Sequence, residues 1–292
     1  MLRPFEIRAG IKRHFPHLYQ LLFLSLLPVF RLWRAYKSWS FKRRVVHNTS
    51  YDGHQFFIVI DPKNGLVDRS IFVGGIYELD IVATINNYLP SGGVFVDIGA
   101  NIGHHSLFAG AVVGDKGKVL SFEPIGQLAD QFDESVAINN FTDRIEIVRQ
   151  ACGDKAGKGT ISLKRDNLGG SSLVAGGNEV STESINICVA DEVISTLKRK
   201  VDMIKIDTEG YEPEVLLGLL KTIERDRPVV ILEYSPILWQ NNNHETGINL
   251  ILQFTTRSYK AYDLDHNQEL IAEVTNWVMT TPYNQTNLLF LP

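Results

Sequence analysis

Short, almost uninterrupted apolar runs alternate with longer segments of helical spacing along most of the chain. This alternation predicts an α/β fold with a central, mostly parallel sheet and helices on both faces. Strands buried on both faces are expected at GVFVDIG, GKVLSFEP, IEIVRQACG, VDMIKIDTEG and RPVVILEYSP. Helices are expected at 78–88, 104–113, 126–139, 190–199 and 212–225. Two later runs, SYKAYDLDH and TNLLFLP, predict further strands that include an antiparallel pair.

The pattern before residue 76 is different. HQFFIVID and VDRSIFVGG both have strand-like composition, and they are joined across PKNG, in which Asn64-Gly65 is a typical hairpin turn. We therefore predict a β-hairpin extension at residues 45–75 before a Rossmann-like main domain at residues 76–292. Within that domain, DNLGGSSLVAGGNEVSTES predicts a long loop or hairpin tip.

Residues 1–44 are strongly basic, with a net charge of +9 in a chain whose total is −4. Their apolar centre has only 13 residues between His17 and Arg31, fewer than the roughly 20 that a membrane-spanning helix needs. Flanking basic residues, Trp33 and Trp39 favour an amphipathic helix lying on an anionic membrane surface. The alternatives are a helix that docks on the main domain or on a second subunit, as in a homodimer, and an unusual membrane span.

The overall composition is that of an ordinary globular protein, with 44% hydrophobic and 21% charged residues. Its two cysteines, Cys152 and Cys188, form no CxxC pair, which argues against a disulfide scaffold or structural zinc and fits a reducing cytosol. The apolar centre of the basic segment argues against a nucleic-acid-binding face. We therefore expect a cytoplasmic protein, peripheral on the inner face of the membrane if residues 1–44 bind lipid.

Acidic residues follow five successive predicted strands. A single acid at a strand end is ordinary, because Asp and Glu also cap helices. In an open parallel sheet, however, ligands bind beyond the carboxyl ends of the strands, so a run of acids at these ends indicates a ligand site. The acids are Asp97, Glu123, Asp154, Asp207 with Glu209, and Glu233.

The turn after the first of these strands contains Asp97, Gly99, Asn101 and Gly103, in the order Asp-x-Gly-x-Asn-x-Gly. A dinucleotide-binding turn would read GxGxxG and leave helix N–H groups free for a pyrophosphate. An acid just before the first glycine repels a pyrophosphate and favours a cationic ligand, which suits S-adenosylmethionine. Glu123, at the end of the next strand, is placed to bind the ribose hydroxyls. These features predict a class I methyltransferase, with an NAD-dependent oxidoreductase or epimerase as the alternative.

Several blocks resemble the FkbM family of S-adenosylmethionine-dependent O-methyltransferases, and the resemblance covers about residues 71–292. They are GGIYELDIV, FVDIGANIGHHSLFAG, VLSFEPI, ACGD, MIKIDTEGYEPEVLLG, VVILEYSP and NLLFLP. The resemblance implies a Rossmann-like methyltransferase that acts on a hydroxyl of a sugar, a glycan or a sugar-containing metabolite. His104-His105 stands where the family usually has aromatic residues, which bears on the fit of the acceptor substrate. A catalytically inactive, membrane-recruited binding protein is the non-enzyme alternative.

Three residues are candidates for the catalytic base. Asp207 is the first choice, because it ends the fourth strand next to where the methyl group should point. Glu209 is the second, with capping of the helix near Pro213 as its alternative role, and His105 is the third, with packing as its alternative.

Two further acids are candidates for cofactor contacts. Glu78 belongs to the family's YE block. Its alternative role is structural, since a negative charge near the N-terminus of the following helix interacts favourably with the helix dipole. Asp154 could bind near the adenine, or be a turn residue with no ligand. Asp207 and Glu233 could also hold Mg²⁺ between neighbouring strand ends, but the second end offers a single acid, so a metal is not favoured.

Overall fold

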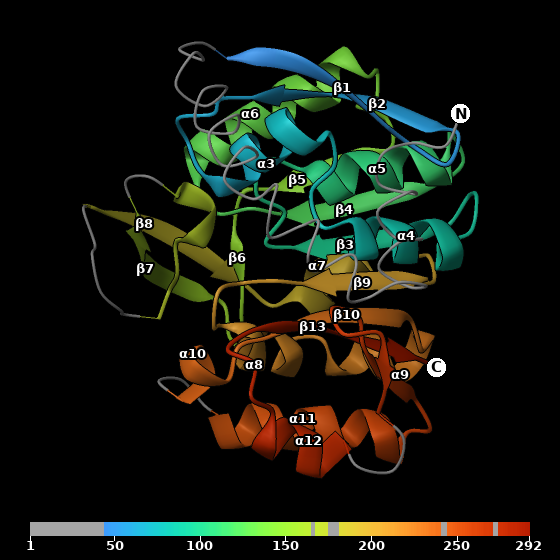
Figure 1. The fold of residues 1–292 in the computed structure, drawn as a ribbon, viewed down its shortest axis with the longest axis vertical. Coiled ribbons are helices and arrows are strands. Elements are labelled where there is room, and N and C mark those ends of the chain that lie inside the picture. Colours follow the sequence, from blue (N-terminus) through green and yellow to red (C-terminus); the bar gives the residue numbers. More distant parts are fainter. Residues whose placement is uncertain (1–43, 165–166, 175–180, 241–243, 271–273) are drawn as a thin grey trace, which may run out of the picture. The chain divides into compact units, whose positions relative to one another are not determined.

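The structure is a computed structural model that describes residues 44–164, 167–174, 181–240, 244–270 and 274–292. Residues 44–292 form one compact unit, drawn in Figure 1. The predicted amphipathic helix at residues 1–44 lies outside the described residues, apart from Arg44. Among the described segments, no helix combines the length and the apolar character needed to cross a membrane.

The unit is built on an eight-stranded sheet, ordered β12-β11-β13-β10-β9-β3-β4-β5. Five neighbouring strands are parallel, and they correspond to the five predicted apolar runs. They are β3 (Val94–Ile98), β4 (Lys118–Phe122), β5 (Ile145–Val148), β9 (Met203–Ile206) and β10 (Val229–Tyr234).

The other three strands complete one side of the sheet. β13 (Thr286–Leu291) pairs antiparallel with both β10 and β11 (Lys260–Asp263), and the short β12 (Gln268–Glu269) follows at the edge. The predicted mostly parallel sheet with a late antiparallel pair is therefore confirmed.

Helices cover both faces of the sheet because successive residues of each buried strand point to opposite sides. On β3, Val94, Val96 and Ile98 belong to one hydrophobic core and Phe95 belongs to the other. The core around Phe95 contains α4 (Leu79–Tyr88), α5 (His104–Val113) and α6 (Gly126–Ile138). The core around Val96 contains α7 (Ala190–Ser195), α8 (Glu212–Leu217), α9 (Leu220–Asp226), α10 (Pro236–Gln240), α11 (His244–Thr256) and α12 (Val274–Thr280).

The β-hairpin lies at a different place from the one predicted. It consists of β1 (Val45–Tyr51) and β2 (His54–Ile60), whereas the expected second strand is a helix, α3 (Leu66–Gly74). Asp52 and Gly53 form the turn with φ of 47° and 87°, and a two-residue turn with both φ values positive matches the twist of a hairpin. The prediction of a hairpin about Asn64-Gly65 was wrong.

Helical spacing explains why residues 66–74 are not a strand. Val67 and Ile71 are four residues apart, so they share one face of α3, and both contribute to the core beneath it. Asp68 on the same helix accepts a hydrogen bond from the backbone N–H of Asp61 at 2.6 Å, which holds the start of the helix against the end of β2.

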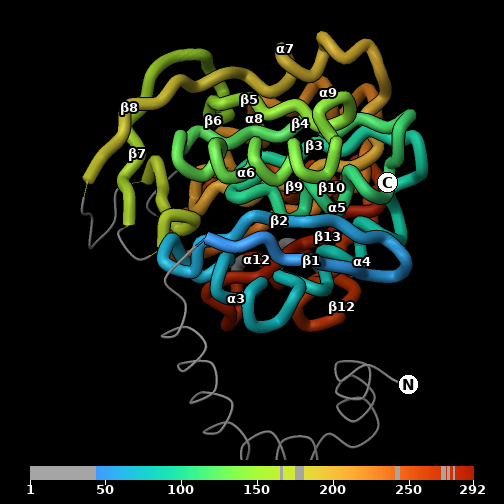
Figure 2. Tube along the Cα trace, turned by 90° about the horizontal axis from the view of Figure 1, so that it is seen from above, coloured from blue at the N-terminus to red at the C-terminus, as the bar shows by residue number. Residues whose placement is uncertain are grey.

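The hairpin forms an outer layer over α5 and α6 (Figures 1 and 2). Phe56, Ile58 and Ile60 of β2 are buried against these helices. The N–H of Val59 also donates to Ser135 Oγ of α6, at 3.0 Å. On this face of the sheet the hairpin is therefore a third layer, outside the helices that cover the sheet.

A second, three-stranded sheet lies beside the main one, in the order β6 (Ala151–Cys152), β8 (Ser181–Cys188), β7 (Gly157–Leu163). The Gly/Ser-rich segment connects the antiparallel strands β7 and β8, so the expected hairpin tip is present. Its described part includes a single 3-10 turn, η1 (Leu168–Gly170).

We expect Ile58→Ala to lower the free energy of unfolding by about 2–5 kcal/mol, because it opens a cavity between β2 and the helices beneath it. Phe57, its neighbour on β2, has 41% of its surface exposed, so Phe57→Ala should cost less than about 1 kcal/mol. Chemical denaturation of both variants measures the difference. Equal losses would contradict the packing of β2 on the helices.

Candidate active site

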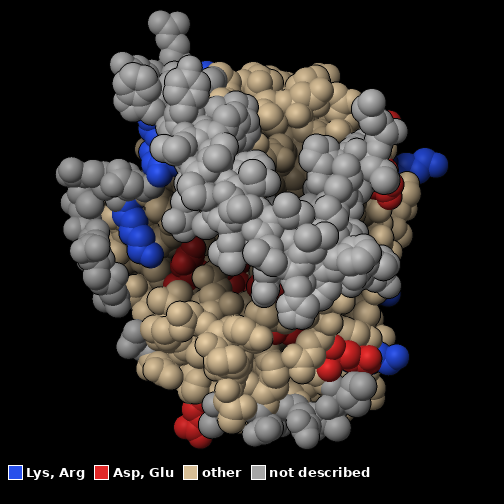
Figure 3. Space-filling model, viewed as in Figure 1, with Lys and Arg blue, Asp and Glu red and all other residues tan. Residues whose placement is uncertain are grey.

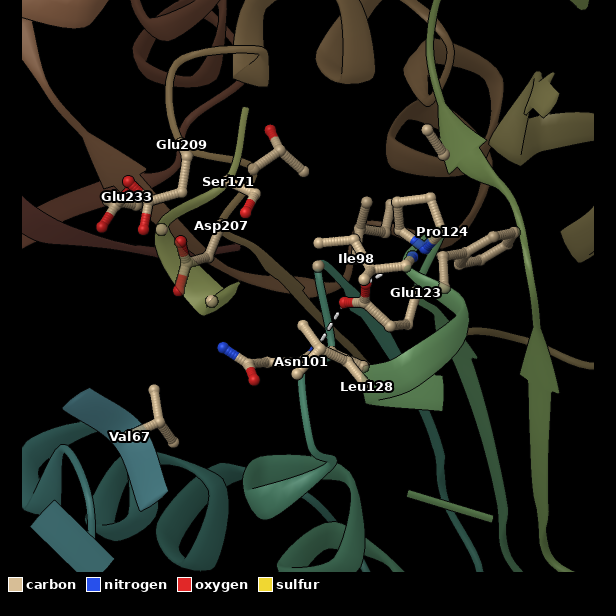
Figure 4. Close-up of a pocket in the computed structure, with 18 of the residues that line it drawn as sticks. Val67, Ile98, Asn101, Glu123, Pro124, Leu128, Ser171, Asp207, Glu209 and Glu233 are labelled. Atoms are coloured by element: carbon tan, nitrogen blue, oxygen red, sulfur yellow. Dashed lines mark hydrogen bonds between the residues drawn. The ribbon is translucent and has the colours of Figure 1, made fainter. Parts of the chain in front are cut away.

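A cavity of about 290 Å³ lies beyond the carboxyl ends of β3, β4, β9 and β10. Apolar residues and Glu123 line one end, and the carboxylates of Asp207, Glu209 and Glu233 gather at the other (Figure 4). Acidic side chains are also visible in the middle of the face shown in Figure 3. Val67 of α3 and Ser171, next to η1, add to the wall.

The glycines of the first turn are required by packing within the protein. Gly99 has φ of 82°, and a Cβ there would lie 1.8 Å from the backbone oxygen of Asp207. Gly103 has φ of 80°, and a Cβ there would lie 2.1 Å from the Phe132 ring. Gly99 and Asn101 line the cavity. The turn is therefore held tightly against the end of β9, which brings two strand ends of the site together.

Asp97 is buried beneath this turn and does not line the cavity. Its Oδ2 accepts a hydrogen bond from Ser106 Oγ at 2.6 Å, and Ser106 Oγ lies 2.8 Å from Ser121 Oγ. Its Oδ1 has no hydrogen-bond partner among the described residues. Burial raises the pKa of Asp97, while nearby Lys205 and Ser106 act in the opposite direction.

Glu123 lines the cavity at the end of β4, as predicted from the sequence. One carboxylate oxygen accepts from the N–H of Asn101 and the other from the N–H of Ile125, both at 2.8 Å. Burial raises the pKa of Glu123 to about 7, although these two N–H groups counteract it. The two bonds fix the plane of the carboxyl group beside the first turn.

Lys205 is a site residue that the sequence reasoning missed. It lies in the middle of β9, is only 2% exposed, lines the cavity, and its Nζ donates to Asp207 Oδ2 at 2.9 Å. Burial lowers the pKa of Lys205, but the carboxylates of Asp207, Asp97 and Glu78 raise it above its usual value. A lysine within the otherwise apolar run MIKI was the signal, because a buried ammonium needs a carboxylate partner.

Glu209 lies two residues after Asp207, lines the cavity and adopts φ of 54°. A non-glycine residue with this conformation is uncommon and is often found at functional sites. Burial, with Asp207 as the next cause, raises the pKa of Glu209 to about 8. The adjoining turn is held by Glu212, which accepts hydrogen bonds from the N–H groups of Thr208 and Gly210 at 2.7 and 3.1 Å.

Glu233 is the penultimate residue of β10 and is 3% exposed. Gln285 Nε2 donates to its Oε1, whereas its Oε2 has no hydrogen-bond partner among the described residues. Burial, followed by the charge of Asp207, raises the pKa of Glu233 well above its usual value. Gln285 also lines the cavity and was not singled out from the sequence.

His104 and His105 lie at the start of α5 and both line the cavity. Burial lowers the pKa of His104 to about 3, and burial with the nearby Lys205 lowers the pKa of His105 well below its usual value. His105 Nε2 lies 3.6 Å from Glu78 Oε2.

Glu78 itself has φ of 47° and lines a neighbouring pocket with Asp265 and Gln285. Burial raises the pKa of Glu78 to about 7.

Asp154 also lies outside the cavity lining, as do the predicted cofactor residues Asp97, Gly103 and Glu78. The side chain of Asp154 is 35% exposed and lies 3.3 Å from Lys155 Nζ. In the segments that the structure describes, there is also no group of three His, Cys, Asp or Glu side chains arranged to hold a metal ion. Roles for Asp154 and Mg²⁺ remain predictions.

The sheet order, the glycine turn and the acidic strand ends together define a Rossmann-like class I methyltransferase. The model of the methyltransferase FkbM domain matches residues 97–271. This match covers more than half of the chain, so the chain belongs to the FkbM family of methyltransferases. The family assignment favours methyl transfer over the nicotinamide-dependent alternative.

Two curated relatives share part of the sequence. The hexuronic acid methyltransferase AglP of Haloferax volcanii is 26% identical over 160 residues, covering 53% of this chain and 61% of AglP. The methyltransferase sdnD of Sordaria araneosa is 28% identical over 163 residues, covering 45% of this chain and 62% of sdnD. The chain thus spans about three fifths of the length of each relative. Among solved structures, the methyltransferase FkbM from Methylobacillus flagellatus has a TM-score of 0.40 and 15% identity, covering 92% of this chain and 60% of that one.

The raised pKa of Glu123 predicts a pH-dependent stability. Its pKa is about 7 in the fold and about 4.3 in an unfolded chain, so the folded state binds the proton more tightly. This contribution to stability is complete below about pH 4 and is lost as the pH rises through about 7. The side chain of Glu123→Gln does not titrate. Between pH 4 and pH 8 the free energy of unfolding of the wild type should therefore fall by about 3 kcal/mol relative to that of the variant.

Chemical denaturation at a series of pH values tests this expectation. Glu224→Gln, at an exposed position on α9, is the matched control and should follow the wild type at every pH. A difference between Glu123→Gln and wild type that stays constant with pH would show that Glu123 titrates normally.

Proposed function

We propose that the protein transfers a methyl group from S-adenosylmethionine to a hydroxyl group of a sugar, a glycan or a sugar-containing metabolite. The observation that carries this proposal is the cavity at the strand ends, which has an apolar wall with one carboxyl group at one end and several carboxyl groups at the other. The FkbM family assignment supports the methyl transfer. The sugar acceptor is supported by the printed activity of the relative AglP, a hexuronic acid methyltransferase.

The residues present suit this cofactor. Phe122, Ile125 and Leu128 supply an apolar surface for the adenine, and Glu123 beside them can accept hydrogen bonds from ribose hydroxyls. The acidic character of the opposite end as a whole suits the positive charge of the ammonium and sulfonium groups, with no single carboxyl group assigned to them. Within the first turn, Gly99 and Asn101 supply the backbone next to the cofactor.

Other predicted cofactor residues lie farther from the cavity wall. We propose that Asp97 and Gly103 act by fixing the shape of the turn, because Asp97 is held by Ser106 and Gly103 packs against Phe132. For Glu78 we propose a position beside the carboxylate end, since it lies 3.6 Å from His105. A contact between Asp154 and the adenine region remains a prediction.

When bound, S-adenosylmethionine supplies an electrophilic methyl group on a sulfonium. We propose that Asp207 accepts the proton of the acceptor hydroxyl as the new C–O bond forms and the C–S bond breaks. Lys205 holds Asp207 in place through the 2.9 Å salt bridge. His105 stays the third candidate, because burial and the nearby Lys205 lower its pKa and it lies beside Glu78 at 3.6 Å. Glu209, with a pKa of about 8, retains its proton at neutral pH and is better suited to orient the hydroxyl.

The test uses S-adenosylmethionine labelled on its methyl group together with a panel of methyl glycosides of neutral hexoses, amino sugars and hexuronic acids. We expect labelled product from at least one glycoside. Asp207→Asn should lower kcat by about 10²–10⁴-fold, because it removes the base, while the Kd for S-adenosylmethionine stays within about threefold.

Asp143→Asn, at an exposed position, makes the same chemical change away from the cavity and should retain full turnover. Unchanged turnover in Asp207→Asn would exclude it as the base. Transfer to no glycoside of the panel would contradict the sugar acceptor, and a wild-type Kd in Glu123→Ala would contradict the proposed place of the ribose.

We also propose that residues 1–44 bring the protein to an anionic membrane surface, because a net charge of +9 surrounds a short apolar segment. Full-length protein should float with anionic liposomes, and the binding should weaken in high salt without vanishing, because buried apolar side chains are not screened. Protein beginning at Val45 should lose liposome binding and keep S-adenosylmethionine binding. No flotation of the full-length protein, with a changed oligomeric state on truncation, would favour the docking helix.

A further inference from the structure

The carboxylate end of the cavity has two acids on neighbouring strands that share one arrangement. In each, one oxygen is held by a donor from the protein. Lys205 Nζ donates to Asp207 Oδ2, and Gln285 Nε2 donates to Glu233 Oε1. Asp207 lines the cavity with 22% of its side chain exposed. One oxygen of each carboxyl group is therefore held in place by a hydrogen bond within the protein.

The second oxygen of Glu233 distinguishes this pair from an ordinary acidic cluster. Glu233 is 3% exposed, and its Oε2 has no hydrogen-bond partner in the described parts of the chain although the residue lines the cavity. A buried polar atom of this kind is costly unless a ligand or an ordered water pairs with it. Figure 4 shows Glu233 beside Glu209, on the same side of the cavity as Asp207 and across it from Glu123.

The strand register places the two acids at matching heights. Ile206 of β9 and Leu232 of β10 are register partners, so Asp207 and Glu233 are the next residues on adjacent parallel strands. Neighbouring strands lie about 4.8 Å apart. Two hydrogen-bonding groups at this separation suit two adjacent hydroxyl groups on one sugar ring, each at O–H···O distances of about 2.7 Å.

We propose that Glu233 is a specificity-determining residue that binds the hydroxyl next to the one being methylated, so that the acceptor is a vicinal diol. The inference rests on the proposed function, in which Asp207 takes the proton of the reacting hydroxyl. Methylation then requires two neighbouring hydroxyls, one at each strand end. A glycoside that lacks the second hydroxyl leaves Glu233 Oε2 unpaired and is a poor acceptor.

The protonation of Glu233 agrees with this role. Burial and the charge of Asp207 raise the pKa of Glu233 well above its usual value, which favours the protonated form of the carboxyl group. Because Oε1 accepts a hydrogen bond from Gln285, the proton of the protonated form would lie on Oε2 and could be donated to a hydroxyl oxygen. An amide in its place can make the same pair of bonds, because its oxygen accepts from Gln285 and its NH₂ donates to the acceptor.

The experiment compares each glycoside methylated by the wild type with every monodeoxy derivative that lacks a hydroxyl next to the methylated position, of which there are two for O3 and one for O2 or O4. We expect one derivative to lose at least about 100-fold in kcat/KM, because a buried group built to bind a hydroxyl rejects the analogue that lacks it. Glu233→Leu should lose a similar factor with the parent glycoside and little with that derivative. The kcat/KM of Glu233→Gln should stay within about tenfold of the wild-type value, both with the parent glycoside and with that derivative.

The Kd for S-adenosylmethionine separates this role from cofactor binding and from misfolding. It should stay within about threefold of wild type in both variants, and Glu224→Gln should match the wild type throughout. Equal kcat/KM for the parent and every such derivative would overturn the proposal, as would a tenfold weaker cofactor affinity in Glu233→Gln. A wild type that methylates no glycoside would overturn the proposed function itself and this inference with it.

Discussion

The site depends on one buried ion pair, the salt bridge between Lys205 and Asp207. Lys205 lies in the middle of a parallel strand and is 2% exposed, and removing an ammonium from water costs several kcal/mol unless anions compensate it. Asp207 contacts it directly, and the carboxylates of Asp97 and Glu78 add to its stabilisation. The acidic side chains of the site thus surround a cation, Lys205, that the protein itself supplies.

The same pair links the cofactor turn to the place of methyl transfer. Gly99 packs so closely on the backbone of Asp207 that no side chain fits between them. Movement of the first turn would therefore displace Asp207, and movement of β9 would disturb the turn. A displacement reaction depends strongly on the relative position of donor and acceptor, so this rigid contact is a structural basis for alignment in the proposed reaction.

Differences in environment allow several nearby carboxyl groups to take separate roles. Asp207 is paired with an ammonium, whereas burial raises the pKa of Glu209 to about 8 and that of Glu233 well above its usual value. Like charges at short distance favour protonation of the groups that lack a cationic partner. In the proposed function, Asp207 accepts a proton while Glu209 and Glu233 orient hydroxyl groups.

The sequence by itself determined the α/β sheet, its five parallel strands, and the acids at their ends, because strand periodicity and turn chemistry are local properties. Glu123, Asp207 and Glu209 reach one cavity because parallel strands end at the same edge. Only the tertiary structure decided that α3 is a helix, that Lys205 pairs with Asp207, that Glu233 Oε2 is unpaired in the described chain, and that Asp154 lies outside the cavity. These outcomes depend on contacts between segments far apart in the chain, and local patterns carry no information about which distant side chain is the partner.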